Sequence, residues 1–265
     1  MAGPADVGVS PADCRVWCID PADAPDWCED LLSGPERARA ESLRHVAARR
    51  RFTTATALLK VAVAESADDD PWKVELRREC PECRGPHGRP DVVGSTLNVS
   101  LSHAGDRVAV ALCADGAVGV DVEQVIADVD VDSMLGFVLS DAERADFRAV
   151  HGRPARVQAF FRCWTRKESV LKATGDGLRI PMSNLTVGAP HDRARLTGFI
   201  DRPDLVETAH IVDLDPGPGY VGAVTVLSAR PVRVRERDGA DAFATAAGFV
   251  RDLVPGHREA HLWRR

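Results

Sequence analysis

Residues 160–178 read FFRCWTRKESVLKATGDGL and are typical of one long amphipathic helix that carries a charge on its apolar side. With about 100° per residue, Phe161 and Leu171 fall within about 60° of Trp164 and form an apolar stripe. Glu168 lies about 40° from Trp164, inside that stripe. Because burying an unpaired charge costs several kcal/mol, the pattern predicts that Glu168 faces a compensating partner.

A candidate partner lies about forty residues earlier, in the segment VGVDVE at 118–123. In a strand, its three valines point to one face, while Gly119, Asp121 and Glu123 point to the other. The two carboxylates repel each other unless a cation lies between them. A solvated strand edge is the alternative interpretation. Together with Glu168 the pair predicts an oxygen-ligand site for a hard cation such as Mg²⁺, which leaves its other positions to water and substrate phosphate.

Two lysines flank Glu168 on the same helix. Lys172 follows it at i+4, and Lys167 lies at the other edge of the apolar stripe. One interpretation is an ordinary helical salt bridge, worth about 0.3–0.5 kcal/mol when exposed. The other is a pair of cations beside a metal-bound phosphate, the arrangement used in phosphoryl transfer.

The rest of the chain predicts an α+β protein with a seam near 114–118. A helical region covers 35–65, and a Pro- and Gly-rich loop covers 80–94. Two strands are expected about the turn at Asp115 and Gly116, and the long helix runs from about Pro154 to a Gly175 cap. Further elements are expected as strands at 97–101, 209–214 and 219–228 and a helix at 241–254.

Composition excludes several classes of function. The chain has 265 residues and a net charge of −6, which argues against a general nucleic-acid binder. No stretch approaches the roughly 18 apolar residues of a membrane-spanning helix, and no leader peptide is visible. Seven scattered cysteines are typical of reduced thiols. We therefore expect a cytoplasmic protein that contacts neither nucleic acid nor membrane.

The two motifs together resemble the Sfp-type 4′-phosphopantetheinyl transferases. That family carries a G-[IV]-D-[IV]-E strand and a W-[ST]-x-K-E-[SA]-x-x-K helix that ends in G-x-G-L, and both match without a gap. LSHAG at 101–105 and GRP at 88–90 resemble two further family segments. The resemblance covers roughly residues 35–180.

The resemblance implies an enzyme that moves the phosphopantetheine arm of coenzyme A onto a serine of an acyl or peptidyl carrier protein, releasing adenosine 3′,5′-bisphosphate. By matching position, Asp121, Glu123 and Glu168 would hold Mg²⁺ against the diphosphate of coenzyme A. Glu168 would also be the base for the serine, directly or through water. Lys172 would neutralise developing charge, with Lys167 assisting.

The resemblance also implies contacts to the nucleotide part of coenzyme A. Ser102 and His103 match the family's serine-histidine segment, and Arg89 follows Gly88 in the GRP segment. Residues 37–51 hold six arginines. Among them Arg37 and Arg51 are candidates for the 3′-phosphate, for which a guanidinium is suited. A solvated helix face is the alternative for this charge run.

For the fold, the resemblance implies a monomer of two similar α+β halves related by a pseudo-twofold axis, with coenzyme A between them. The halves would be 1–116 and 117–230, followed by a C-terminal helical extension at 231–265. Cys80, Cys83 and His87 form at most half a zinc site, and a plain loop is the alternative. A non-catalytic binder of coenzyme A and a metal-dependent phosphoesterase are the competing functions, and the sequence leaves the carrier open among polyketide, peptide and fatty-acid synthases.

Overall fold

The computed structural model describes residues 10–79, 85 and 88–253, and its architecture is mixed α+β, as predicted. Cys80, Cys83 and His87 lie outside the described residues. None of the described helices is long and apolar enough to cross a bilayer.

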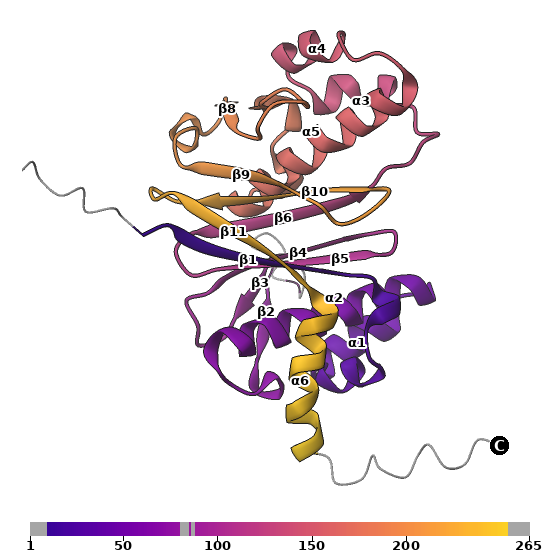
Figure 1. Cartoon of the computed structure of the whole chain (residues 1–265), viewed down its shortest axis with the longest axis vertical. Coiled ribbons are helices and arrows are strands. Elements are labelled where there is room, and N and C mark those ends of the chain that lie inside the picture. Colours follow the sequence, from indigo (N-terminus) through magenta and orange to yellow (C-terminus); the bar gives the residue numbers. More distant parts are fainter. Residues whose placement is uncertain (1–9, 80–84, 86–87, 254–265) are drawn as a thin grey trace, which may run out of the picture.

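The first half is a four-stranded sheet with helices on its outer face (Figure 1). In spatial order the strands are β11 (Val232–Asp238), β1 (Ala12–Ile19), β5 (Arg107–Cys113) and β4 (Asn98–Ala104). Strand β1 pairs antiparallel with β5 and parallel with β11. The helices are α1 (Gly34–Ser42), α2 (Val46–Ala67) and α6 (Gly239–Leu253). The hairpin of β2 (Leu76–Arg78) and β3 (Pro90–Val92) flanks β4.

The second half is built around a three-stranded antiparallel sheet and one long helix. Its strands, in spatial order, are β6 (Ala117–Gln124), β10 (Tyr220–Leu227) and β9 (Ala209–Leu214). Helix α5 (Arg153–Thr174) covers this sheet, after α3 (Val131–Val138) and α4 (Asp141–Phe147). A small hairpin joins β7 (Leu185–Val187) and β8 (Leu196–Phe199). Short 3₁₀ helices are η1 (Pro21–Asp23), η2 (Asp26–Leu31), η3 (Pro71–Lys73), η4 (Gly177–Arg179), η5 (Met182–Asn184) and η6 (Pro203–Leu205).

The two sheets pack face to face, with α2 outside one and α5 outside the other (Figure 1). Their shared core holds small side chains such as Val16 and Ala111 of the first sheet and Val120 and Val224 of the second. The alternating valines of β6 therefore point into this core, and its other face is turned to α5. Beside this interface β4 lies next to β6, where Ser100 Oγ accepts from Val120 N at 3.0 Å.

The structure refines three expectations about the chain. The helical region predicted at 35–65 is two helices, because Leu43 and His45 have extended backbones between α1 and α2. Strands β5 and β6 flank the predicted turn but belong to different sheets. The described part of the predicted C-terminal extension joins the first half, since β11 pairs with β1 and Phe243 of α6 is buried against Trp27.

Candidate active site

The site is formed where α5 packs closely against β6. Gly119 of β6 makes this approach possible, because a Cβ there would lie 2.1 Å from Ser169 O and 2.4 Å from Ala173 N of the helix. Only a glycine leaves room for those backbone atoms. The close packing brings the outward face of β6, with Asp121, against the helix turn that carries Lys172.

Asp121 is at the centre of a buried network and is only 3% exposed. Lys172 Nζ donates to its Oδ1 at 2.7 Å, and Ser102 Oγ donates to the same oxygen at 2.8 Å. Lys172 Nζ also lies 2.9 Å from Ser102 Oγ and 3.1 Å from Val120 O. The second carboxylate oxygen, Oδ2, is buried without a hydrogen-bond partner among the described residues. A buried carboxylate oxygen with a free lone pair suits a cation as its further partner.

The other two predicted metal ligands are electrostatically coupled to Asp121. Burial raises the pKa of Glu123 to about 7, and the negative charges of Asp121 and Glu168 add to the rise, against Lys172 and a hydrogen bond from Trp164. Burial also raises the pKa of Glu168, again with Asp121 adding and Lys172 opposing. A cation near the three side chains would stabilise their charged forms.

The structure does not itself form a closed metal site. In the described part of the chain, no three His, Cys, Asp or Glu side chains are close enough together to hold one ion. Lys172 supplies the positive charge next to Asp121 instead. The donor set fits a hard cation in chemistry, so the prediction that Asp121, Glu123 and Glu168 share one Mg²⁺ stays a prediction.

Cationic side chains from the first half surround this acidic centre. Burial lowers the pKa of His103, and the positive charges of Arg51, Lys172 and Arg78 contribute to the lowering. Arg51 Nη1 donates to Gly105 O at 3.0 Å, in the turn after His103. Like charges held near one another favour an anion beside them.

Arg89 and Arg78 approach the site from the β2–β3 hairpin. Arg89 Nη1 donates to Ala173 O at 3.4 Å, near the carboxyl end of α5. Arg78 lies opposite Pro90 in the hairpin register and was not predicted from the sequence. Its only sequence signal is the pair Arg77–Arg78 shortly before the GRP segment, which does not show which arginine faces the site.

One predicted phosphate ligand, Lys167, lies elsewhere. Lys167 is 0% exposed, and its Nζ donates to three carbonyls of the second half, at 2.7 Å from Val138 O, 3.1 Å from Met182 O and 2.7 Å from Leu185 O. It also pairs with Glu143 of α4. The role predicted for Lys167 is therefore corrected, because its amine is enclosed between α5 and the elements packed on that flank.

The role predicted for Arg37 stays a prediction. Arg37 lies on α1, and its guanidinium donates to Leu32 O at 3.4 Å, with none of the other predicted site residues among its described partners. Glu143, the unforeseen partner of Lys167, has a local signal, since Ser140 and Glu143 form a capping box at the start of α4.

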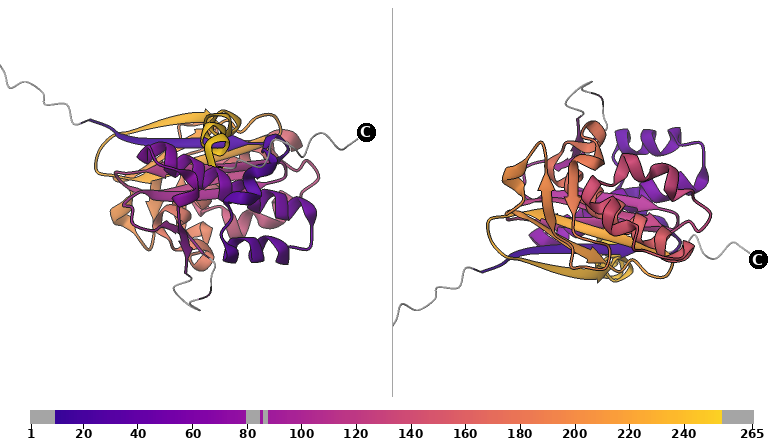
Figure 2. Two further views of the ribbon diagram at one scale, coloured as in Figure 1. Left: turned by 90° about the horizontal axis from the view of Figure 1, so that it is seen from below. Right: turned by 90° about the horizontal axis from the view of Figure 1, so that it is seen from above.

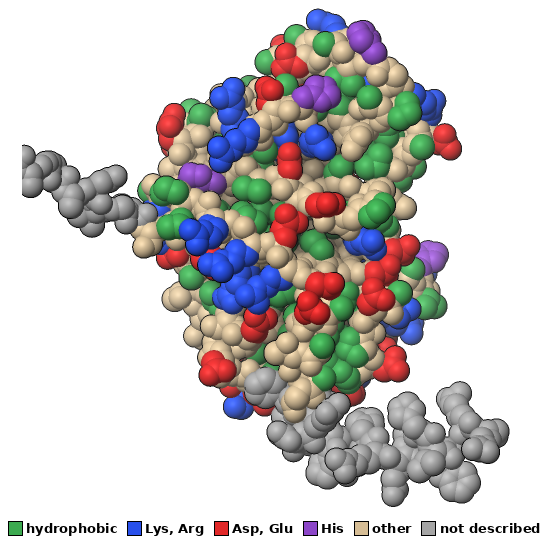
Figure 3. Space-filling model, viewed as in Figure 1, with side chains coloured by type: hydrophobic (Ala, Val, Ile, Leu, Met, Phe, Trp, Pro, Cys, Tyr) green, Lys and Arg blue, Asp and Glu red, His purple; other side chains and the backbone are tan. Residues whose placement is uncertain are grey.

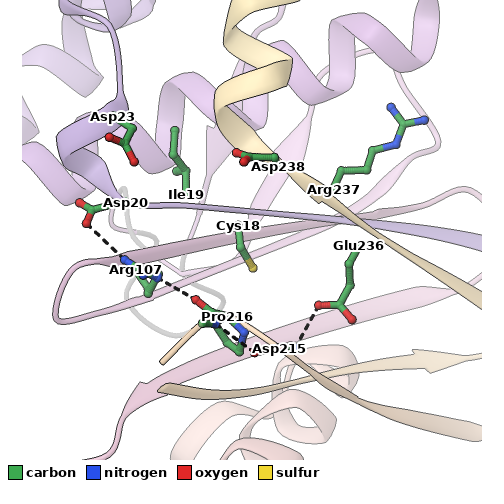
Figure 4. Close-up of a pocket in the computed structure, with 11 residues that line it drawn as sticks. Cys18, Ile19, Asp20, Asp23, Arg107, Asp215, Pro216, Glu236, Arg237 and Asp238 are labelled. Carbon is green, nitrogen blue, oxygen red and sulfur yellow. Dashed lines mark hydrogen bonds and ion pairs between the residues drawn. The ribbon is translucent and has the colours of Figure 1, made fainter. Parts of the chain in front are cut away.

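A separate hollow of about 430 Å³ contains none of the predicted site residues. It lies between the ends of β1 and β11 and the turn before β10 (Figure 4). Arg107 crosses it, bonding Asp20 at 3.2 Å and Pro216 O at 2.7 Å. Exposed acids such as Asp23 and Asp238 make up much of its wall.

Comparison with known proteins agrees with this geometry. Residues 117–225, which include β6 and α5, match the family model described as the 4′-phosphopantetheinyl transferase superfamily. In this region the chain is therefore similar to members of that superfamily. The matched segment contains Asp121, Glu123, Glu168 and Lys172, whereas the cationic residues from the first half lie outside it.

Curated proteins named as 4′-phosphopantetheinyl transferases are also similar in sequence to this chain. The chain is 26% identical over 151 residues to the putative 4′-phosphopantetheinyl transferase slr0495 of Synechocystis, covering 56% of this chain and 58% of the relative. It is 39% identical over 93 residues to AcpT of Salmonella typhi, covering 34% and 47%. Against psf-1 of Bacillus pumilus it is 28% identical over 190 residues, covering 70% and 75%. The chain thus spans about half the length of the first of these relatives.

Proposed function

We propose that the protein is a Mg²⁺-dependent 4′-phosphopantetheinyl transferase of the Sfp type, which moves the phosphopantetheine arm of coenzyme A to a serine of an acyl or peptidyl carrier protein. The superfamily match and the names of the relatives support the reaction. The observation that carries the proposal is the buried, unpartnered Oδ2 of Asp121 beside Lys172.

Asp121, Glu123 and Glu168 would hold the Mg²⁺ ion. Bound there, the ion would neutralise the diphosphate and orient it for attack. Support comes from the raised pKa values of Glu123 and Glu168, which burial causes first and the negative charge of Asp121 second. Three carboxylate donors suit Mg²⁺, which keeps its other positions for water and phosphate.

In the reaction the serine oxygen forms a bond to the phosphorus next to the pantetheine arm. The bond from that phosphorus to the bridging oxygen breaks, and adenosine 3′,5′-bisphosphate leaves with the electron pair. Glu168 accepts the serine proton, directly or through water, and without a bound cation burial raises the pKa of its carboxyl. Lys172, held by Asp121 and Ser102, stabilises the negative charge on the leaving phosphate.

The nucleotide would lie along the cationic side of the site. Arg51, Arg89 and His103 are the residues we assign to its phosphates, with Ser102 orienting Lys172 and Asp121. Arg78 joins this group because its charge acts on His103. Coenzyme A would therefore span the two halves of the molecule.

We further propose that the two halves are related by a pseudo-twofold axis and that the protein acts as a monomer. The matching of α2 and α5, each of 22 residues and each outside one sheet, supports the symmetry. The five described cysteines are free thiols, which favours the reducing cytoplasm.

One assay tests the proposal. The protein is incubated with coenzyme A, Mg²⁺ and an apo carrier domain, and the intact mass of the carrier is measured. A covalent phosphopantetheine adduct that depends on Mg²⁺ is the expected result. Unchanged carrier with hydrolysed coenzyme A would identify a phosphoesterase, and coenzyme A binding with neither product would identify a non-catalytic binder. Glu168→Gln, which removes the proposed base, is measured in the same assay. Glu236→Gln, a change to an exposed acid on β11, is its control.

A further inference from the structure

The amino end of α2 and the turn before it present a cationic surface with an exposed apolar centre. Its members, named here the α2 surface, are Arg44, Val46, Arg49 and Arg50. All four residues are exposed, and Val46 is 78% exposed. Residues 43–51 contain no acidic residue, although the whole chain carries a charge of −6.

This charge distribution is unfavourable for the helix itself. The first turn of a helix has a partial positive charge, so acidic side chains stabilise it and arginines destabilise it. None of the ion pairs of the described residues involves Arg44, Arg49 or Arg50, and Arg50 bonds only the backbone oxygen of Ala22, at 3.1 Å. The arginines therefore do not serve the stability of α2, and an anionic partner would offset their repulsion.

Two exposed arginines of β11 are, by contrast, neutralised within the fold. Figure 3 shows basic side chains gathered where β11 and β1 lie. There Arg235 pairs with Asp13 at 2.8 Å, and Arg237 pairs with Glu65. Seen from below, β11 lies on one side of the molecule and α1 on the other (Figure 2).

The α2 surface adjoins the reaction site. Arg51, the residue after it, bonds Gly105 O at 3.0 Å. Gly105 follows the strand that carries Ser102 and His103, and Ser102 bonds Asp121. The α2 surface is therefore one of the surfaces that a protein could contact while its serine enters the site.

We infer that the α2 surface docks an acidic face of the acceptor protein, next to the serine that is modified. The inference rests on the proposed function, because it names how the acceptor of that reaction is recognised. Arg44 and Arg49 attract the acidic face and steer its approach, while Val46 contacts an apolar side chain at its centre. Charges at the rim of an interface act mainly on the rate of association and on its salt dependence.

The test compares Arg49→Glu with Arg233→Glu. Arg233 is an exposed arginine of β11, so the two variants change the net charge equally. Initial rates are measured with apo acyl carrier protein at saturating coenzyme A, and then with coenzyme A varied. We expect Arg49→Glu to raise the KM for the carrier by about tenfold at low salt, with kcat and the KM for coenzyme A unchanged. The difference should shrink at high salt, and Arg233→Glu should match the wild type.

Two results would overturn the inference while leaving the proposed function intact. One is equal behaviour of both variants in active enzyme. The other is a raised KM for coenzyme A in Arg49→Glu, which would assign the α2 surface to the nucleotide. If the wild type transfers nothing, the proposed function fails, and calorimetric binding of apo acyl carrier protein then decides the inference. Equal affinity of wild type and Arg49→Glu would refute it, and weaker binding by Arg49→Glu alone would support it.

Discussion

Lys172 Nζ lies 2.7 Å from Asp121 Oδ1, while the other oxygen of the same carboxylate is buried and has no hydrogen-bond partner in the described part of the chain. The two oxygens of Asp121 thus have different environments. One is held by a lysine from α5 and a serine from β4, and the other is available to a cation. Lys172 therefore places a positive charge against Asp121 in the protein without a bound metal.

Asp121→Asn should abolish Mg²⁺ binding while leaving the fold in place. The amide keeps the size of the side chain and an oxygen for Lys172, but it removes the charge that attracts the cation. We expect transfer to fall by at least about 10²-fold, as for loss of one preorganised electrostatic group. Differential scanning fluorimetry with and without Mg²⁺ measures the binding. If Mg²⁺ stabilised the variant as much as the wild type, the assignment of Asp121 as a Mg²⁺ ligand would be refuted. Glu236→Gln is the control.

Gly119→Ala should displace α5 from β6. Its Cβ would lie 2.1 Å from Ser169 O, which is backbone and cannot turn aside. We expect a loss of about 1–3 kcal/mol in the free energy of unfolding, typical of overpacking, together with loss of activity. Gly136→Ala in α3 is the matched control, because nothing lies within 4 Å of the added methyl. Urea denaturation compares the two, and equal stability would mean that the contact is not tight.

The elements of the site could be read from the sequence because their signals are local. The alternating valines of VGVDVE fix which face of β6 carries Asp121, and the helical period puts Glu168 on the same side of α5 as Lys172, where it is half-buried. The ion pair of Lys172 could not be read in this way. Its i+4 spacing suggested Glu168, whereas the structure pairs it with Asp121, fifty-one residues away in sequence.

The misplaced elements depend on contacts that no local pattern contains. Lys167 lies at the edge of the apolar stripe, and only the packing of α4 supplies Glu143 to it. Strand β11 was assigned to a separate extension, although its parallel pairing with β1 joins the two ends of the described chain. Such pairings are set by the surfaces that remain uncovered once the rest of the chain is folded.

Lys167→Met and Lys172→Met should separate stability from activity. Lys167 and Glu143 form a fully buried pair, so removing one partner leaves an uncompensated charge and should cost about 3–5 kcal/mol. Lys172 is 28% exposed, and its loss should lower turnover far more than stability. Denaturation and transfer rates are measured for both variants. Equal destabilisation of the two would contradict the different positions given to these lysines.

Binding of adenosine 3′,5′-bisphosphate should raise the pKa of His103. Without ligand, burial and the neighbouring cations lower this pKa below its usual value, so the ring is neutral at pH 7. The unfolded chain then binds more protons than the folded one just below about pH 6.5, and stability contributed by His103 is lost as the pH falls through that range. A phosphate beside the ring favours the charged form, so binding takes up a proton and strengthens as the pH falls from 8 to 6.

Titration of the ring signals by NMR, without metal, measures this effect. His103→Gln identifies the signal, and the exposed His191 serves as the internal reference. We expect the midpoint of His103 to move upward with the bisphosphate and that of His191 to stay in place. A midpoint of His103 unaffected by saturating ligand would remove this residue from the nucleotide site, because a phosphate dianion within a few ångströms of an imidazole must stabilise its protonated form.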